Sequence, residues 1–352
     1  MGCSSSQEAR TPSKARPGGR PIVTLTGVTG YLGSQVCLLY LKDGGFRVRG
    51  TVRDKSNEAK LAPLREAFGA LFSELELVEA NLDNEQSMID AIRGSTYVVH
   101  MASPFFMKGN EETLVAPAVN GTLAAMKACQ AAGVKRCVVT SSVASVMFMA
   151  EADRPADNVF NESHWSNPDR PEGFHPYLKS KTLAEKTAWD FQKALPEAER
   201  FEIVTICPGF IMGPPLKKES STSIDWMKNL LDGTTKEISS GTSTIVDVRD
   251  VAQAHLLAIK NAKAANRRFL LVHSNPSYLE YAAPVEAKYR PLGWPITEAK
   301  AAPKANDRVS LVDNSASKEL GVVYTDMAKT MVDMADAMVA KGMVTKPAAA
   351  PQ

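Results

Sequence analysis

The chain has 352 residues, of which 44% are hydrophobic and 23% are charged, and its 41 Lys and Arg against 39 Asp and Glu leave a formal net charge of +2. This length allows one large domain or two joined domains with an extensive core, and the composition is that of a globular protein. No apolar run is long enough to cross a membrane as a helix, and the balanced charge argues against a nucleic-acid-binding surface.

The first twenty residues are rich in Ser, Arg, Pro and Gly, and we expect 1–20 to be a disordered tail. Its start, Met-Gly-Cys-Ser-Ser-Ser, places Gly2 and Ser6 as an N-myristoylation signal requires, with Cys3 beside them as a palmitoyl acceptor. The basic residues that follow favour an anionic membrane surface. The sequence therefore predicts a cytoplasmic protein, with peripheral attachment to the cytoplasmic face of a membrane if the N-terminus is acylated. A tail without this role is the alternative.

A glycine-rich turn follows the first predicted strand and leads directly into a helix. Gly27 suits a tight turn, Gly30 lets the backbone approach a pyrophosphate, and Gly33 allows close packing of the helix on the strand. The backbone N–H groups at the helix start, at Tyr31 and Leu32, then face the phosphates. A plain turn would also contain glycine, but the position between strand and helix favours a dinucleotide site.

Strand and helix patterns alternate over the following 180 residues or so. Strands are predicted over 21–26, 46–52, 75–79, 96–101, 134–141 and 201–207, and helices over 31–42, 57–69, 85–93, 112–132 and 176–194. Such alternation predicts an α/β fold with a doubly wound parallel sheet of the Rossmann type.

After Pro208 the alternation breaks into shorter elements. We expect a dinucleotide-binding domain over 21–210, a smaller substrate-binding lobe over 211–342, and a frayed tail over 343–352. The substrate cleft belongs at the carboxyl edge of the sheet, where open α/β sheets bind ligands.

The second predicted strand ends in Arg53 rather than in the acidic residue that binds a ribose 2'-hydroxyl. A guanidinium suits a 2'-phosphate, and Lys60 offers a second positive contact, so the sequence favours NADP(H) as the cofactor. Two solvated surface cations are the alternative, and Asp54 keeps NAD open.

A Tyr and a Lys four residues apart open the helix predicted at 176–194. Pro176 suits the first helical position, so Tyr177 and Lys181 lie on one face. A free phenol has a pKa of about 10, and a neighbouring ammonium is expected to lower it enough for proton transfer near neutral pH. Ser142 ends the fifth predicted strand at the edge where a nicotinamide would lie, and its hydroxyl can orient a substrate carbonyl. A strand-ending role for this serine is the alternative.

The cysteines have no C-x-x-C spacing, so we expect buried thiols in a reducing compartment and neither a metal site nor a disulfide framework. His255 lies on an apolar helix face and is interpreted as a core residue.

These motifs together resemble the extended short-chain dehydrogenase/reductases, most of all the group of dihydroflavonol reductase, cinnamoyl-CoA reductase and methylglyoxal reductase. The matching stretches are 26–33, 48–54, 99–104, 139–142, 177–185, 208–214 and 247–255.

The resemblance implies catalysis by Ser142, Tyr177 and Lys181, with Lys181 also holding the nicotinamide ribose. It implies 2'-phosphate contacts from Arg53 and Lys60. Further cofactor contacts would come from Asn81, Leu82, Met101, Ala102, Ser103, Pro208, Gly209, Phe210 and Ile211.

The sequence departs from the family at several positions. Asn81 stands where the family usually has Asp, Asn120 does not align with the family's active-site asparagine, and Met147 replaces a polar residue of the flavonoid reductases. Neither plant substrate is therefore expected. Apolar residues would gather around the site on this alignment, which favours an apolar aldehyde or ketone: Phe105, Phe106, Met107, Met147, Phe148, Met149, Phe174 and Phe210.

We therefore predict an NADP(H)-dependent oxidoreductase that reduces an aldehyde or ketone, or oxidises the alcohol, with a Ser-Tyr-Lys triad. An epimerase or sterol dehydrogenase of the same fold is one alternative, and a non-catalytic dinucleotide-binding regulator is another.

Overall fold

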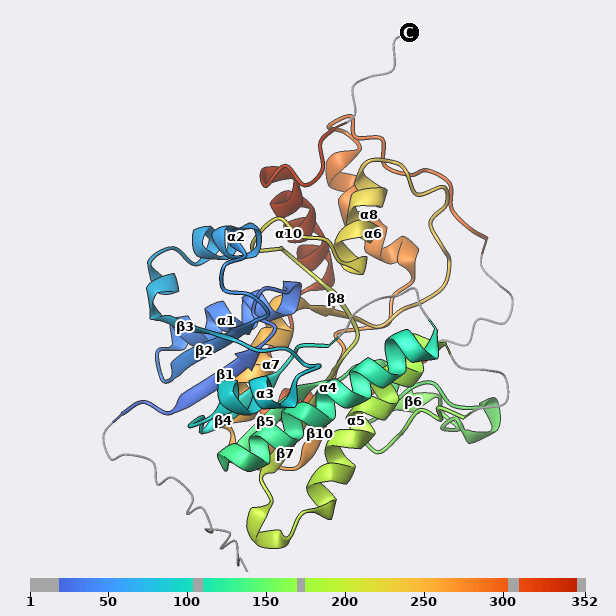
Figure 1. The fold of residues 1–352 in the computed structure, drawn as a ribbon. Helices are drawn as coiled ribbons and strands as arrows, with labels where there is room; N and C mark the ends of the chain where they lie inside the picture. Colours follow the sequence, from blue (N-terminus) through green and yellow to red (C-terminus); the bar gives the residue numbers. More distant parts are fainter. Residues whose placement is uncertain (1–18, 104–109, 170–174, 303–309, 347–352) are drawn as a thin grey trace, which may run out of the picture.

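The computed structural model describes residues 19–103, 110–169, 175–302 and 310–346 (Figure 1). The predicted lipidation positions, Gly2 and Cys3, lie outside these ranges.

A parallel sheet forms the centre of the molecule, and its strand order is β10-β7-β5-β4-β1-β2-β3. The strands are β1 (Ile22–Thr26), β2 (Arg47–Val52), β3 (Leu75–Glu79), β4 (Tyr97–His100), β5 (Arg136–Thr140), β7 (Glu202–Pro208) and β10 (Arg267–Leu271). Every neighbouring pair is parallel. The predicted Rossmann-type sheet is confirmed. Its last strand, β10, comes from the range that we had predicted for the second lobe, so the expected boundary at 210 does not separate the whole sheet from the rest.

Helices cover both faces of the sheet, as the continuous apolar strands require. They are α1 (Tyr31–Asp43), α2 (Glu58–Phe68), α3 (Glu85–Ile92), α4 (Glu111–Ala132), α5 (Pro176–Ala194) and α7 (Val248–Lys260). Asn57, Asn84 and Asn110 cap α2, α3 and α4, each accepting a hydrogen bond from a backbone N–H in the first turn.

Successive strand residues point to opposite faces and divide the core in two. Val99 and Val138 pack with α1 and α7, whereas Val98 and Cys137 pack with α3, α4 and α5. Figure 1 shows α4 and α5 side by side along one face of the sheet. The thiols of the four described cysteines, Cys37, Cys129, Cys137 and Cys207, are buried, as predicted.

A second lobe has its own apolar core and lies beyond the carboxyl ends of the strands (Figure 1). It is built mainly from α6 (Thr222–Leu231), α8 (Tyr278–Tyr289) and α10 (Met327–Ala340), with β8 (Phe210–Met212) paired to β9 (Ile245–Asp247). Val344, expected in a frayed tail, is buried in this core. The predicted tail is therefore wrong at its start, because the apolar side chains after α10 pack against the lobe.

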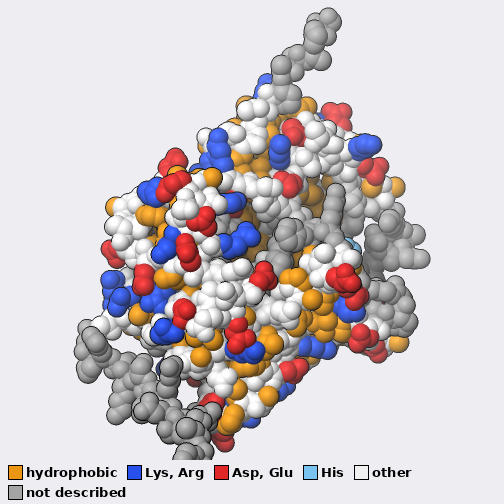
Figure 2. Space-filling view, viewed as in Figure 1, with side chains coloured by type: hydrophobic (Ala, Val, Ile, Leu, Met, Phe, Trp, Pro, Cys, Tyr) orange, Lys and Arg blue, Asp and Glu red, His pale blue; other side chains and the backbone are white. Residues whose placement is uncertain are grey.

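The remaining short elements complete the chain. They are β6 (Val159–Phe160), β11 (Leu311–Val312), α9 (Ser315–Leu320) and 3-10 helices at Gly69–Glu74, Val143–Ser145, Glu151–Asp153, Glu197–Glu199 and Ala262–Ala264. On the face shown in Figure 2, acidic and basic side chains are interspersed over the described residues. None of the helices in the described ranges combines the length and apolar character needed to cross a membrane.

Candidate active site

The strand order reverses between β1 and β4, since the chain first builds outward through β2 and β3 and then returns to the other side of β1. In open α/β sheets the crevice at such a point, outside the carboxyl ends of the strands, is where ligands bind. Predicted site residues follow β1, β4, β5 and β7, which are neighbours at this edge, and others follow β2 and β3 or lie on α2 and α5.

The turn after β1 requires glycine at defined places. Gly27 has φ 76°, and a Cβ on Gly33 would lie 2.1 Å from the Gly27 carbonyl oxygen. Gly30 N donates to that same oxygen at 3.1 Å, which closes the turn. Among the described residues no side chain caps α1, and its first turn contains no acidic residue. The N–H groups of this turn are therefore suited to an anion, as predicted for a pyrophosphate.

The segment after β4 is tied to the glycine turn by one hydroxyl. Thr26 Oγ1 accepts from the backbone N–H groups of Met101 and Ala102, both at 3.0 Å. The Thr26 hydroxyl then donates its own proton to His100 Nδ1 at 3.1 Å. The neutral His100 ring therefore carries its proton on Nε2. Burial first, and then the Lys181 charge, lower the pKa of His100 to about 4, so it stays neutral at pH 7.

The predicted catalytic residues meet at the ends of β5 and α5. His175 caps α5 by accepting from Tyr177 N at 3.2 Å, which sets the start of the helix that carries Tyr177 and Lys181. Thr182 Oγ1 on α5 donates to Ala144 O at 3.2 Å, which ties this helix to the turn after β5. The Ser142 hydroxyl accepts from Ala144 N at 3.1 Å, and its interaction with Tyr177 acts to lower the pKa of that phenol. Because its lone pair takes the Ala144 N–H, its proton is free to be donated to the phenol oxygen.

Lys181 connects this group to the cofactor side of the site. Its Nζ donates to Ser103 Oγ at 3.3 Å and lies 5.9 Å from the centre of the Tyr177 ring. Ser103 follows the segment held by Thr26, so Lys181 lies between the phenol and the glycine turn.

The predicted lowering of the Tyr177 pKa is wrong in direction. Burial raises the pKa of Tyr177 above its ordinary value, and the interaction with Ser142 acts in the opposite direction. The same burial lowers the pKa of Lys181 to about 8. Desolvation therefore acts on both groups, and it favours the neutral phenol.

The predicted 2'-phosphate contacts are on the surface beside β2. Arg53 follows β2, Lys60 lies near the start of α2, and both are exposed. The Asp54 carboxylate is turned away into a local turn, where Oδ1 accepts from Ser56 N at 2.7 Å and Ser56 Oγ at 2.6 Å. These bonds lower the pKa of Asp54. With this carboxylate engaged, the positive groups dominate the end of β2.

Asn81 and Leu82 follow β3. Asn81 is exposed and its Oδ1 accepts from Asp83 N at 3.2 Å, which leaves one lone pair on that oxygen. Leu82 packs on the core beneath α3 and α4, next to Gly121. The family-type active-site asparagine has no counterpart at Asn120, because that residue is exposed on α4.

Residues 208–211, which were predicted to contact the cofactor, end β7 and lead the chain into the second lobe. Gly209 N donates to Leu271 O at 3.0 Å, and Phe210 N donates to Thr244 O at 2.8 Å. A Cβ on Gly209 would lie 2.8 Å from the Thr244 hydroxyl, so only glycine fits. Tyr31 OH donates to Gly213 O at 2.7 Å and joins this wall to the glycine turn.

Several of the apolar residues that were predicted to surround the substrate pack in cores of the protein instead. Met147 and Met149 are buried in a core cluster with Phe160, and Phe148 packs against the same cluster. Phe210 packs against the core of the second lobe. The remaining predicted positions lie outside the described residues: Phe105, Phe106, Met107 and Phe174.

Two buried polar groups complete the region. His255 is a satisfied core residue, as predicted, with Nε2 bonded to Thr140 Oγ1 and Nδ1 to Val251 O, both at 2.7 Å. Glu185 was not predicted to have a role, yet it is buried behind the serine segment and paired with Arg268 at 2.7 Å. The available signal was its place four residues after Lys181, on the same helix face.

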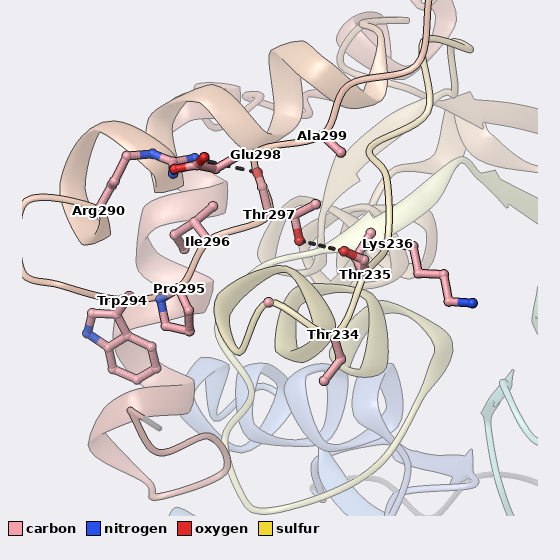
Figure 3. Close-up of a pocket in the computed structure, with 11 residues that line it drawn as sticks. Thr234, Thr235, Lys236, Arg290, Trp294, Pro295, Ile296, Thr297, Glu298 and Ala299 are labelled. Carbon is pink, nitrogen blue, oxygen red and sulfur yellow. Dashed lines mark hydrogen bonds and ion pairs between the residues drawn. The ribbon is translucent and has the colours of Figure 1, made fainter. Parts of the chain in front are cut away.

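A separate open hollow of about 500 Å³ lies in the second lobe, between residues 233–236 and 290–299 (Figure 3). A hydrogen bond from Thr297 Oγ1 to Thr235 O links the two walls, and an ion pair of Arg290 with Glu298 lies within the second wall. None of the predicted site residues lines it. The predicted site residues therefore lie at the edge of the sheet and away from this hollow.

Three comparisons with known proteins show the family and the fold. Residues 23–271 match the NAD dependent epimerase/dehydratase family. Cinnamoyl-CoA reductase CAD2 of Medicago truncatula is 32% identical over 321 residues, which cover 90% of this chain and 95% of that protein. Dihydroflavonol 4-reductase of Zea mays is 31% identical over 325 residues, covering 90% and 87%. The crystal structure of yeast methylglyoxal/isovaleraldehyde reductase complexed with NADPH has a TM-score of 0.78 and 26% identity, covering 92% of this chain and 100% of that one.

Proposed function

The chain belongs to the NAD dependent epimerase/dehydratase family, in its extended short-chain dehydrogenase/reductase group, and we propose that it is an NADP(H)-dependent reductase of an aldehyde or ketone. The observation that carries this proposal is the grouping of Ser142, at the end of β5, with Tyr177 and Lys181 on α5. Thr182 Oγ1 of this helix donates to Ala144 O at 3.2 Å, and Lys181 Nζ lies 5.9 Å from the centre of the Tyr177 ring and donates to Ser103 Oγ.

The residues at the cofactor positions fit a phosphorylated dinucleotide. Gly27 and Gly33 carry no side chains, so the backbone of this turn is open to close approach by a ligand. The N–H groups of the uncapped first turn of α1 suit a pyrophosphate. Arg53 and Lys60 offer two cations for a 2'-phosphate, while the engaged Asp54 does not compete for it. The solved yeast reductase of this fold is complexed with NADPH, which supports the same choice here.

The protein groups then have separate roles in the reaction. NADPH supplies a hydride to the carbonyl carbon when bound. When substrate is bound, Ser142 turns its single proton from the Tyr177 oxygen to the carbonyl oxygen, and Tyr177 donates its own proton to that oxygen as charge develops on it. The raised pKa of Tyr177 keeps the phenol protonated before the reaction. The Lys181 ammonium stabilises the phenolate that forms and binds the nicotinamide ribose.

NADPH consumption with a panel of aldehydes and ketones tests the proposal. Tyr177→Phe should lower kcat by about 100-fold or more while NADPH affinity stays unchanged, since general acid catalysis contributes about 10²- to 10⁴-fold. Tyr289→Phe is the matched control, because Tyr289 OH bonds Asp336 at 2.7 Å in the second lobe. Equal rates for wild type and Tyr177→Phe would remove the proposed acid.

The alternative within the family is an epimerase or a sterol dehydrogenase. An epimerase would turn over nucleotide sugars without net consumption of NADPH, so the same assay separates it from a reductase. A non-catalytic regulator would bind NADPH and consume none with any substrate.

We also propose that the N-terminus carries lipid and tethers the protein to the cytoplasmic face of a membrane. The support is the sequence Met-Gly-Cys-Ser-Ser-Ser, with Gly2 and Cys3 as the acyl acceptors. Because one acyl chain binds weakly, the second acyl group or the basic residues behind it are needed for stable attachment. Metabolic labelling with a myristate analogue should mark wild type and not Gly2→Ala. Unlabelled wild type would contradict the tether.

A further inference from the structure

A buried carboxylate behind the Ser142 segment ties the serine turn, residues 141–145, to the helix that carries Tyr177 and Lys181. Glu185 is 1% exposed and comes one helical turn after Lys181. Its Oε1 accepts from Arg268 Nε at 2.7 Å and from Thr205 Oγ1 at 2.8 Å. Its Oε2 accepts from Ser141 Oγ at 2.6 Å and from Ser145 Oγ. One oxygen therefore faces the sheet, and the other faces the serine turn.

Glu185 is held as an anion by these contacts. Burial by itself would raise its pKa, but the Arg268 charge and the hydrogen bonds outweigh burial and leave the pKa below its ordinary value. Arg268 is fixed in turn by the carbonyls of Glu162 and His164, and its guanidinium lies 3.6 Å from the centre of the Trp165 ring. The Glu185–Arg268 pair is therefore held by fixed partners on both sides and gives the serine turn a rigid support.

Ser145 lies between Glu185 and Ser142 and is within hydrogen-bond distance of both. Its hydroxyl has one proton and three possible acceptors within reach, which are Glu185 Oε2, the carbonyl of Ser142 at 2.7 Å and Ser141 Oγ at 3.1 Å. Its backbone N–H donates to the same Ser142 carbonyl at 3.0 Å. The backbone of Ser142 is thereby held on one side while Ala144 N holds its hydroxyl on the other. The direction of the Ser142 proton toward Tyr177 depends on this turn.

We propose that Ser145, anchored by Glu185, is a positioning residue that aims the Ser142 hydroxyl at Tyr177 and the substrate carbonyl. This inference rests on the proposed function. A buried pair that only stabilises the fold is the competing explanation, and it predicts a loss of stability without a specific loss of rate.

Two isosteric variants separate these explanations, because each removes one hydroxyl from the same carboxylate. Ser145→Ala breaks the link toward the serine turn, whereas Thr205→Val breaks the link toward β7. We expect similar losses of thermal stability from both, since Ser145 and Thr205 are equally buried. We expect Ser145→Ala to lower kcat by about 10- to 100-fold, as small misplacements of reacting groups do, with NADPH affinity unchanged. Thr205→Val should keep kcat within about twofold of wild type.

A double-mutant cycle with Ser142→Ala tests whether Ser145 acts through Ser142. In the Ser142→Ala background, Ser145→Ala should cost no further activity. The pH dependence of kcat/KM gives a second readout, because a lost hydrogen bond from Ser142 should move the transition of Tyr177 to higher pH in Ser145→Ala only.

The inference is overturned if wild type reduces a carbonyl and Ser145→Ala does so at the same rate. It is also overturned if Thr205→Val lowers kcat as much as Ser145→Ala does. A third contrary result is a Ser142→Ala/Ser145→Ala double variant whose fold-loss of activity equals the product of the two single fold-losses. A wild type that consumes no NADPH with any carbonyl contradicts the proposed function instead, so the two failures are distinguishable.

Discussion

Replacing Lys181 by Met should stabilise the protein while abolishing its activity. Burial lowers the pKa of Lys181 from 10.5 to about 8, so the fold holds an ammonium at pH 7 at an energetic cost. At 1.36 kcal/mol for each tenfold change in proton affinity, this cost is up to about 3 kcal/mol. Removing the hydrogen bond to Ser103 loses about 1 kcal/mol. Lys181→Met should therefore raise the free energy of unfolding by about 2 kcal/mol at pH 7.

The stability difference should depend on pH in a direction set by the two pKa values. Between about 8 and 10.5 the unfolded chain binds more protons at this lysine than the folded chain does, so wild type becomes more stable as the pH rises. The cost of burying the ammonium is complete below about pH 8 and disappears toward pH 10.5, so the net advantage of Lys181→Met is gone at about pH 9.5. Between pH 7 and pH 9.5 it should shrink by about 2 kcal/mol.

Urea unfolding followed by tryptophan fluorescence, at both pH values, measures this difference. Lys179→Met is the matched control on the same helix, because Lys179 pairs with Glu111 at the surface at 3.0 Å, and removing such a pair changes stability by less than about 1 kcal/mol. A destabilised Lys181→Met at pH 7, or a difference that stays constant with pH, would refute the reasoning from burial.

Three further predictions concern the cofactor side of the site. Gly33→Ala should lower the thermal midpoint strongly, since its Cβ would lie 2.1 Å from the Gly27 carbonyl oxygen, whereas Gly30→Ala, with 3.4 Å to that oxygen, should melt near wild type; equal midpoints would contradict the packing argument. Arg53→Gln should weaken NADPH binding by about 10-fold or more and leave NADH binding unchanged, as measured by fluorescence titration, because a charge-assisted bond contributes about 1.5–3 kcal/mol. The reductase rate should fall as the pH rises past about 8, where the Lys181 ammonium is lost, and a rate that stays flat to pH 10 would exclude this role.

The sheet was predictable because its signals are local. β1, β4, β5 and β7 each contain a short apolar run, and the helices α2, α3 and α4 begin at the polar caps Asn57, Asn84 and Asn110. Parallel topology then brings the ends of these strands to one edge, so Ser142 and the segments after β1 and β4 could be placed together before their geometry was known.

What the sequence did not reveal depends on contacts between distant residues. Arg268 lies 83 residues from Glu185, and no periodicity links them. β10 follows a stretch of lobe residues, so its return to the sheet leaves no local pattern. The direction of the Tyr177 pKa depends on how deeply α5 is packed, and spacing to Lys181 does not contain that information. A methionine such as Met147 suits a hydrophobic core and the wall of a substrate pocket equally well, so the sequence does not distinguish these two positions.

The central claim is that a hydride passes from the nicotinamide to a carbonyl carbon at the site of Ser142 and Tyr177. The most direct measurement uses NADPH with deuterium at both C4 positions and a carbonyl substrate from the panel, with mass spectrometry of the product. We predict an alcohol with one deuterium on the former carbonyl carbon, formed by wild type and strongly reduced in Tyr177→Phe. An unlabelled product, or label formed equally by both proteins, would contradict the account.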